Sequence, residues 1–153
     1  MQNIEEHIKL KPELLERILN QNKGTIEIIS FIKYPVDSHV GIIPIIKINL
    51  RKSSAKSLES FKKGIRENIN GMKIFFPDLR IIDESTVLKI NGKNCIFSSF
   101  DYMLEANNGK EKASVFLYAI PNGDTFYQIA LMDSEKENNT VIFEKVLKSI
   151  KID

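Results

Sequence analysis

The sequence predicts an α+β fold in which a central antiparallel sheet carries helices on both faces, a three-layer α/β/α sandwich. Three Asn-Gly pairs separate runs of alternating apolar residues in the C-terminal half of the chain. The runs between them are apolar on both faces, and two amphipathic helical stripes are available as cover. We expect about six strands, in the order β-β-α-β-β-β-β-α after an N-terminal helix.

The Asn-Gly pairs predict three tight hairpin turns, because Asn and Gly both accept positive φ in a two-residue loop. The pairs are Asn91-Gly92, Asn108-Gly109 and Asn122-Gly123. Three such turns in series join four strands, which we expect near residues 81–90, 95–104, 113–120 and 126–132. The C-terminal half is therefore predicted to form a four-stranded antiparallel meander.

Both faces of this meander are apolar. Val115 and Leu117 point to one side of their strand, whereas Phe116, Tyr118 and Ile120 point to the other. An antiparallel sheet with one solvated face would show polar residues at one of these two sets of positions. Each face therefore needs a covering layer, and helices are the expected cover.

The chain before the sheet is predicted to form an amphipathic helical extension, residues 1–24, followed by a single domain, residues 25–153. Pro12 lies where a helix can begin, and Gly24 lies where it should end.

The domain is predicted to begin with two paired strands. From Thr25 the residues are β-branched and aromatic up to Pro35, which predicts a strand that ends there. A turn is expected at residues 37–41, and alternation from Ile46 to Arg51 predicts the second strand.

Two further helices complete the prediction. Ser57 can cap a helix with the apolar stripe Leu58, Phe61, Ile65 and Ile69, and Gly71 can supply a left-handed residue at its end. A final helix is expected around residues 142–150, with Asn139 or Thr140 as its cap.

Composition excludes several classes of protein. The chain has 153 residues and a net charge of +2, so it lacks the basic excess of a dedicated nucleic-acid binder. The single cysteine, Cys95, cannot form an internal disulfide or a paired metal-ligand motif. No stretch approaches 18 apolar residues, which predicts a soluble, cytoplasmic chain. A periplasmic or envelope-associated location is the alternative if an export signal was removed.

Candidate catalytic chemistry is sparse. His7 and His39 have no cysteine or acidic residue at a metal-ligand interval, so we interpret both as surface histidines. Cys95 has apolar neighbours and is expected to pack in the core. Five acidic residues could in principle form a hydrolase pair or a cation site, but their spacing shows no convergence: Asp78, Asp83, Glu84, Asp101 and Glu105.

Two segments are candidate partner-binding surfaces. The first is the basic helix face that carries Lys62, Lys63 and Arg66, which could dock an acidic partner or an anionic membrane. The alternative interpretation of this face is the ordinary solvated side of an amphipathic helix. The second segment contains Phe75 and Phe76, of which at least one ring should enter the core, and an exposed ring would indicate a contact site.

The layout of the chain resembles the PsbP-like family from Thr25 onward. The resemblance rests on three segments: Ile32-Lys33-Tyr34-Pro35, Ile90-Asn91-Gly92-Lys93 and the closing stretch FEKVLKSIK at residues 143–151. This family includes the PsbP subunit of photosystem II, DcrB-type bacterial envelope proteins and a Ran-binding nuclear import factor. The resemblance implies a non-enzymatic adaptor, assembly factor or chaperone.

We therefore expect a protein-binding module that needs no cofactor and no metal, is not an enzyme, and has another protein as its partner. Peripheral membrane contact is a further expectation from the basic helix face. The alternative is a small-ligand or lipid carrier with an apolar cavity between sheet and helix.

Overall fold

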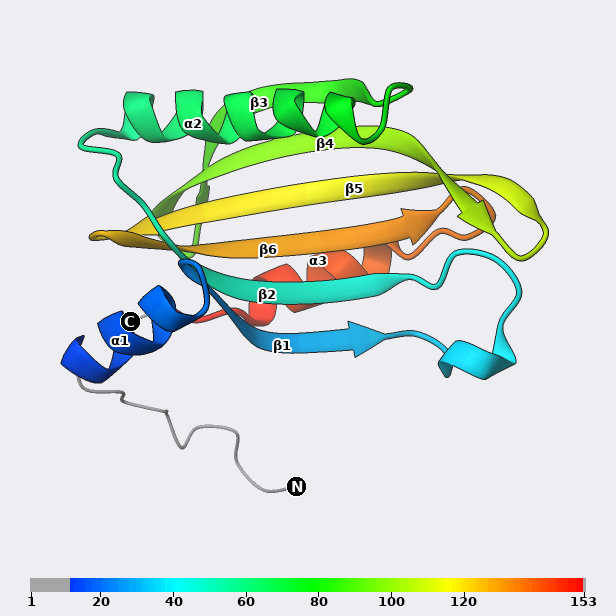
Figure 1. Ribbon diagram of the computed structural model, residues 1–153, viewed down its shortest axis with the longest axis horizontal. Coiled ribbons are helices and arrows are strands. Elements are labelled where there is room, and N and C mark those ends of the chain that lie inside the picture. Colours follow the sequence, from blue (N-terminus) through cyan, green and yellow to red (C-terminus); the bar gives the residue numbers. More distant parts are fainter. Residues whose placement is uncertain (1–11, 153) are drawn as a thin grey trace.

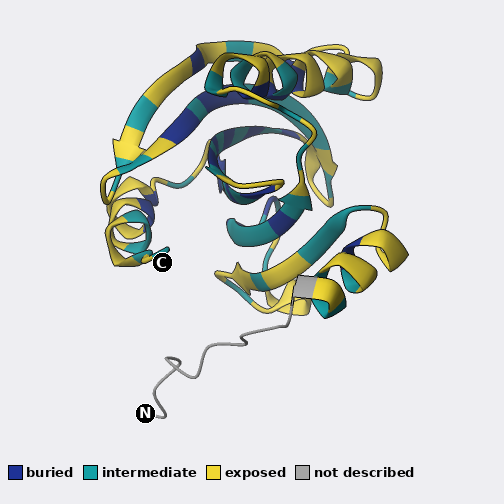
Figure 2. Ribbon diagram, turned by 90° about the vertical axis from the view of Figure 1, so that its left-hand side faces the viewer, coloured by how far each residue is buried: buried dark blue, intermediate teal, exposed yellow. Residues whose placement is uncertain are grey.

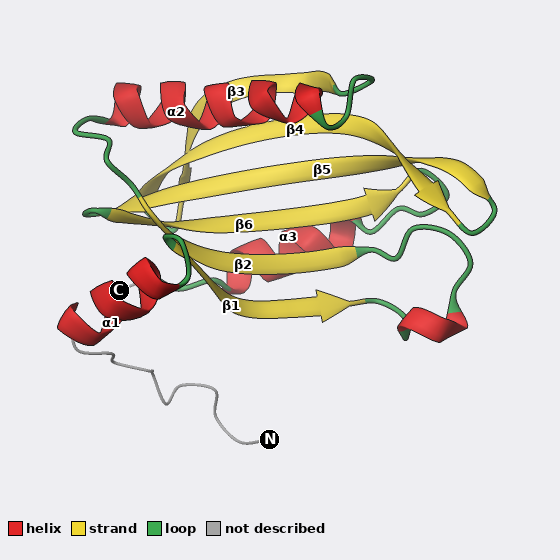
Figure 3. Cartoon of the chain, viewed as in Figure 1, coloured by secondary structure: helices red, strands yellow, loops and turns green. Residues whose placement is uncertain are grey.

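The computed structural model describes residues 12–152 and shows one six-stranded antiparallel sheet with three α-helices. The mixed α+β composition and the six-stranded sheet predicted from the sequence are confirmed. Figure 1 labels the elements and Figure 3 separates helices, strands and loops. The helices are α1 (Pro12–Gln21), α2 (Leu58–Gly71) and α3 (Thr140–Ser149). The strands are β1 (Thr25–Ile32), β2 (Ile45–Lys52), β3 (Arg80–Ile90), β4 (Lys93–Ala106), β5 (Gly109–Asn122) and β6 (Thr125–Ser134).

The sheet has the strand order β1-β2-β6-β5-β4-β3. Strands β3 to β6 follow one another as the expected meander, and the β1–β2 hairpin joins it where β2 pairs with β6. β1 and β3 are therefore the two edges of the sheet. Seen end-on in Figure 2, the sheet is strongly curved.

All three Asn-Gly pairs lie at two-residue hairpin turns, but only at the first turn do the Asn and the Gly themselves form the loop. Asn91 and Gly92 both have positive φ, at 48° and 82°. At the second turn the loop is Asn107 and Asn108, and Gly109 already pairs with Ala106. At the third turn Asn122 pairs with Thr125, so Gly123 is the first central residue, as in a type II′ turn.

The predicted alternation of the meander holds. One face of the sheet meets α2 in a core that includes Phe61, Ile65 and Ile69 of the helix with Val115 and Leu117 of β5. The other face meets α3 in a core that contains Ile120, Ile129, Leu131 and Phe143, with Phe116 and Tyr118 packed against it. α2 and α3 thus contact opposite faces of the sheet (Figure 1).

α2 begins as predicted and ends differently. The Ser57 side chain accepts a hydrogen bond from the Ser60 backbone N–H, and the Ser60 side chain completes a capping box. The prediction that Gly71 is a left-handed terminal residue is wrong, because its φ is −62°. The chain instead tightens into a 3₁₀ turn, Met72–Ile74, which keeps Met72 packed against the core.

α1 lies next to β1 and ends at Gln21, and the turn that follows it closes at Gly24, the glycine predicted to end the helix. Gly24 has a φ of 79°, and its N–H donates to the Leu19 carbonyl. Leu19 is buried. The part of the predicted extension before Pro12 lies outside the described residues. Within residues 12–152 no helix is long and apolar enough to cross a membrane.

Candidate functional site

Phe75 and Phe76 lie in opposite environments at the junction between α2 and β3. Phe76 packs against the core on the α2 side, and its ring centroid is 4.4 Å from that of Tyr102. Phe75 is 78% exposed, and its neighbour Ile74 is exposed as well. One ring therefore enters the core and the other faces solvent.

The basic residues predicted on the second helix lie on the side of α2 away from its buried stripe. Lys63 and Arg66 are exposed and Lys62 is half-buried. Lys63 pairs with Glu67 one turn further along α2, at 3.8 Å. Such a surface pair contributes little to stability. No contact in the described structure brings Phe75 to this basic face.

A surface that the sequence analysis did not single out is more apolar than either candidate. Of the eleven exposed large apolar residues among those described, seven lie on β1, on the loop that follows it, and on the first turn of α3. They are Ile28, Phe31, Ile32, Val36, Val40, Val141 and Ile142. Single exposed apolar residues are ordinary, but a concentration of this kind is typical of a contact surface.

An apolar groove connects β1 to α3 within this region. It encloses about 190 Å³ and is lined by Phe31, Ile32, Lys33, Pro44, Ile46, Asn139, Ile142 and Phe143. Phe31 pairs with Ile46 across the β1–β2 hairpin, and Ile46 packs against the core on the α3 side of the sheet. We call the groove and the seven exposed residues the β1–α3 surface.

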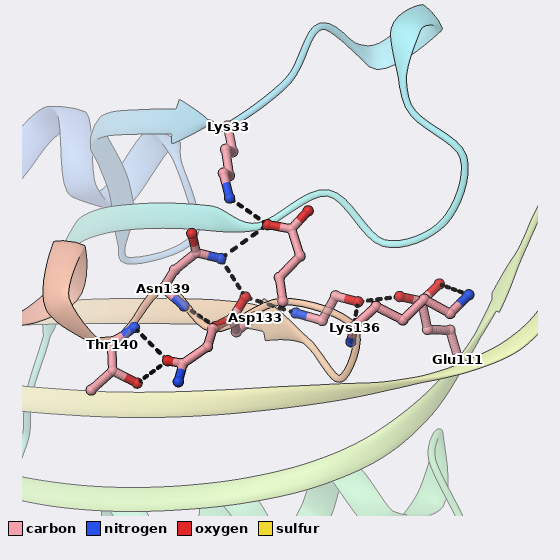
Figure 4. Close-up of polar contacts among 9 residues, drawn as sticks. Lys33, Glu111, Asp133, Lys136, Asn139 and Thr140 are labelled. Carbon is pink, nitrogen blue, oxygen red and sulfur yellow. Dashed lines mark hydrogen bonds and ion pairs between the residues drawn. The ribbon is translucent and has the colours of Figure 1, made fainter.

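A buried polar network lies beside this surface and fixes its outline (Figure 4). Glu111 of β5 is only 2% exposed. Its carboxylate accepts hydrogen bonds from the Ser134 hydroxyl and from the Ile42 backbone N–H, and it pairs with Lys136 at 3.6 Å. The Ser134 hydrogen bond is the main reason why the pKa of Glu111 is held below its usual value.

The same network joins the loop after β1 to the start of α3. Lys33 pairs with Glu137 at 2.5 Å, and this hydrogen bond lowers the pKa of Glu137 and raises that of Lys33. Asp133 accepts hydrogen bonds from the Asn139 backbone and side chain, at 2.8 and 2.7 Å. These contacts hold both walls of the β1–α3 groove in place.

Asn139 therefore has a different role from the predicted one. It occupies the position before the first residue of α3, but its side chain makes no capping hydrogen bond. Its side-chain amide instead donates hydrogen bonds to the carboxylates of Asp133 and Glu137. At the helix start, the Asn138 side chain accepts hydrogen bonds from the backbone and hydroxyl of Thr140.

The remaining chemical candidates have ordinary structural partners. Cys95 is fully buried, and burial raises its pKa to about 12, so its thiolate is suppressed. His39 stacks on Tyr34 with ring centroids 4.4 Å apart, and His7 lies outside the described residues.

Four of the five acidic candidates interact with other side chains or backbone groups, and the fifth faces solvent. Asp83 accepts a hydrogen bond from Ser99, Asp78 accepts one from the Met103 backbone, and Asp101 pairs with Lys112. Glu84 is exposed, and Glu105 pairs with Lys110. In the described part of the chain, no three His, Cys, Asp or Glu side chains are grouped to hold a metal ion.

No protein-family model matches this chain, and a search of curated proteins finds no match. The fold is similar to that of PA94 from Pseudomonas aeruginosa, a protein of unknown function suggested to be a regulator. The TM-score is 0.59 at 7% identity, over 82% of each chain. A second solved structure is LpqN, involved in cell envelope biogenesis of Mycobacterium tuberculosis. Its TM-score is 0.47 at 11% identity, over 77% of this chain and 66% of LpqN. The likeness to PA94 shows a shared fold only.

Proposed function

We propose that this protein is a non-enzymatic protein-binding module, a three-layer α/β/α domain of the PsbP-like type, and that the β1–α3 surface holds its partner. The observation that carries the proposal is that three exposed large apolar residues, Phe31, Ile32 and Ile142, line one groove, and that four more lie on the same strand, the following loop and the same helix. Solvent contact with this many large apolar side chains is unfavourable, and burial against a partner removes it. Phe31 and Ile142 are the central contacts, because both are exposed and both line the groove.

The partner that best fits is an extended segment of another protein. In the described structure no strand pairs with the outer edge of β1. An unpaired edge offers backbone N–H and C=O groups, and the adjacent groove accepts the apolar side chains on one face of an added strand. Exposed charge normally protects such an edge, yet β1 carries Ile28, Phe31 and Ile32 exposed to solvent.

The β1–α3 groove is less well suited to carry a small apolar ligand. The groove encloses about 190 Å³, whereas ligand pockets measure roughly 300 Å³ or more. The network around Glu111 and Asp133 also fixes the walls, so the groove has little means to widen. A retained small molecule in the native mass spectrum of purified protein would favour the carrier instead.

The experiment is a quantitative pull-down from lysate of the source cells with the double variant F31S/I142S. Removal of two apolar contacts from the groove should reduce recovery of a specific partner by about tenfold or more. Val87→Ser is the matched control, because Val87 is an exposed apolar residue on β3, the opposite edge of the sheet. Equal recovery by F31S/I142S and the unchanged protein would contradict the proposal.

The Phe75 side chain and the basic face of α2 stay candidate contacts in this proposal. Phe75→Ala and charge reversal of Lys62 and Lys63 belong in the same pull-down. If these variants lose the partner and F31S/I142S does not, the binding surface lies on the α2 side of the sheet.

A further inference from the structure

Two open clefts adjoin at the first turn of α2, on the other face of the sheet from α3. One encloses about 510 Å³ and reaches across to Lys93 at the start of β4. The other encloses about 490 Å³ and reaches Lys52 at the end of β2. They share part of the segment before α2, including Lys56, and the buried ring of Phe61. We call these two adjoining clefts together the α2 cleft.

Lysines from three separate segments line the α2 cleft. Lys52 and Lys56 are exposed, Lys93 and Leu58 are half-buried, and Phe61 is buried. Among the described residues, neither Lys56 nor Lys93 forms an ion pair, and Lys52 donates a hydrogen bond to the neutral Asn20 amide. Positive charge therefore surrounds recessed apolar walls without an acidic side chain in the lining.

The acidic residues near the α2 cleft do not neutralise the charge of its lysines. Glu59 on the first turn of α2 and Asp124 in the β5–β6 turn are the local carboxylates, and both are exposed and outside the lining. The start of α2 itself supplies no open site, because Ser57 and Ser60 cap each other's backbone groups. The recognition chemistry comes from the lysines and the shape of the cleft.

We propose that the α2 cleft is a second recognition site, which binds an extended acidic segment of a protein. Carboxylates of the segment pair with Lys56 and Lys93, which both line the cleft, and its aliphatic carbons contact Leu58. A flat anionic membrane fits less well, because the apolar walls are recessed below the charges. Single-stranded nucleic acid fits less well, because the two aromatic rings in the lining, Phe61 and Phe126, are both buried and offer no stacking surface.

This site is distinct from the β1–α3 surface. Ile46 lines the groove and Lys52 lines the cleft, and the six residue steps along β2 from one to the other span about 20 Å. The two sites also lie on opposite faces of the sheet. Failure of either proposal therefore leaves the other intact.

The test is fluorescence anisotropy of purified full-length protein with a fluorescein-labelled peptide of alternating Glu and Ser. Saturable binding is expected, and the double variant K56E/K93E should weaken it by about tenfold or more. K145E/K148E makes the same change in net charge with two exposed lysines of α3, and it should alter the affinity by less than about twofold. F31S/I142S should leave the peptide affinity unchanged.

Three outcomes would overturn the proposal. The first is the absence of saturable peptide binding, and the second is equal weakening by K145E/K148E, which would show a response to net charge only. The third is tighter binding to phosphatidylserine vesicles or to oligo(dT) than to the peptide, with loss of that binding in K56E/K93E. Circular dichroism of each variant checks that it is folded.

Discussion

Phe75 and Phe76 show at the scale of single residues how adjacent identical side chains acquire different roles. Phe76 lies against Tyr102 and the core beneath α2, whereas Phe75 is exposed. The 3₁₀ turn Met72–Ile74 ends immediately before them, and it directs the two rings apart. One ring stabilises the fold, and the other is available for contact.

Alanine substitution should distinguish the contributions of Phe75 and Phe76 to stability. Phe76→Ala should lower the free energy of unfolding by about 2–3 kcal/mol, because it removes a half-buried ring and leaves a cavity. Phe75→Ala should change it by less than about 0.5 kcal/mol, because the ring is in solvent. Urea denaturation of both variants measures the difference. Equal losses of stability would contradict the assigned environments.

Residue patterns predicted the environment of many side chains but not of Glu111. In the run Lys110-Glu111-Lys112 it reads as one of three solvated charges at a strand start. A signal was nonetheless present, because Glu111 is in phase with Ala113, Val115 and Leu117, which are all buried. Its partners Ile42 and Ser134 are 69 and 23 residues away in sequence, so the sequence does not reveal the contact.

At the scale of elements, the loop between β1 and β2 is held to the sheet by Glu111. The Ile42 N–H donates to its carboxylate, and Gly41 lies so close that a Cβ there would come within 2.5 Å of Glu111 Oε2. This loop carries Val36 and Val40 of the β1–α3 surface. Its position therefore decides the shape of the proposed binding site.

Gly41→Ala should detach this loop. It should cost about 2 kcal/mol or more of unfolding free energy, from strain at positive φ and from the clash with Glu111. Gly109→Ala is a close control, because its φ is 107° against 106° for Gly41 and a Cβ there meets nothing within 4 Å. Thermal denaturation compares them. A Gly41→Ala variant no less stable than Gly109→Ala would exclude the packed carboxylate.

Local sequence patterns predicted the individual helices and strands better than they predicted the arrangement of these elements in the sheet. The Asn-Gly pairs located all three hairpins, yet strand pairing shifted two of the turns by a residue relative to the pair. Ser57 capped α2 as expected, and Gly71 is its last residue, but Gly71 is not left-handed because the chain continues into a 3₁₀ turn that keeps Met72 against the core. Apolar residues predicted β1 as a strand. That β1 is a sheet edge depends on the pairing of β2 with β6, which has no local signal.

At the scale of the whole molecule, carboxylates with lowered pKa values make stability depend on pH. Glu111 and Glu137 both have pKa values below the usual value in the folded state. Their contribution is therefore fully present above the unfolded pKa, about 4.3 for Glu. It is lost as the pH falls through the folded values, because both carboxylates must then accept protons.

Glu111→Gln tests this dependence. At pH 7 the variant should be less stable by about 1–3 kcal/mol, because a buried carboxylate with three partners is replaced. At pH 3, below the unfolded pKa of about 4.3, the difference should shrink, because protonation of the carboxylate in the unfolded state removes part of the contribution of Glu111 to stability. Glu105→Gln is the control, because Glu105 forms only an exposed pair with Lys110 at 3.8 Å. Urea denaturation at both pH values gives the comparison, and a pH-independent deficit for Glu111→Gln would refute it.

The central claim is that the β1–α3 surface holds another protein, and site-specific photo-crosslinking in the source cells tests it most directly. A benzoylphenylalanine side chain would replace Phe31 in one variant and Val87 in another. Phe31 is 55% exposed and Val87 46%, on opposite edges of the sheet. We predict a discrete protein adduct from position 31 that position 87 does not form and that Ile142→Ser abolishes. Absence of an adduct at position 31, or equal adducts at both positions, would contradict the claim.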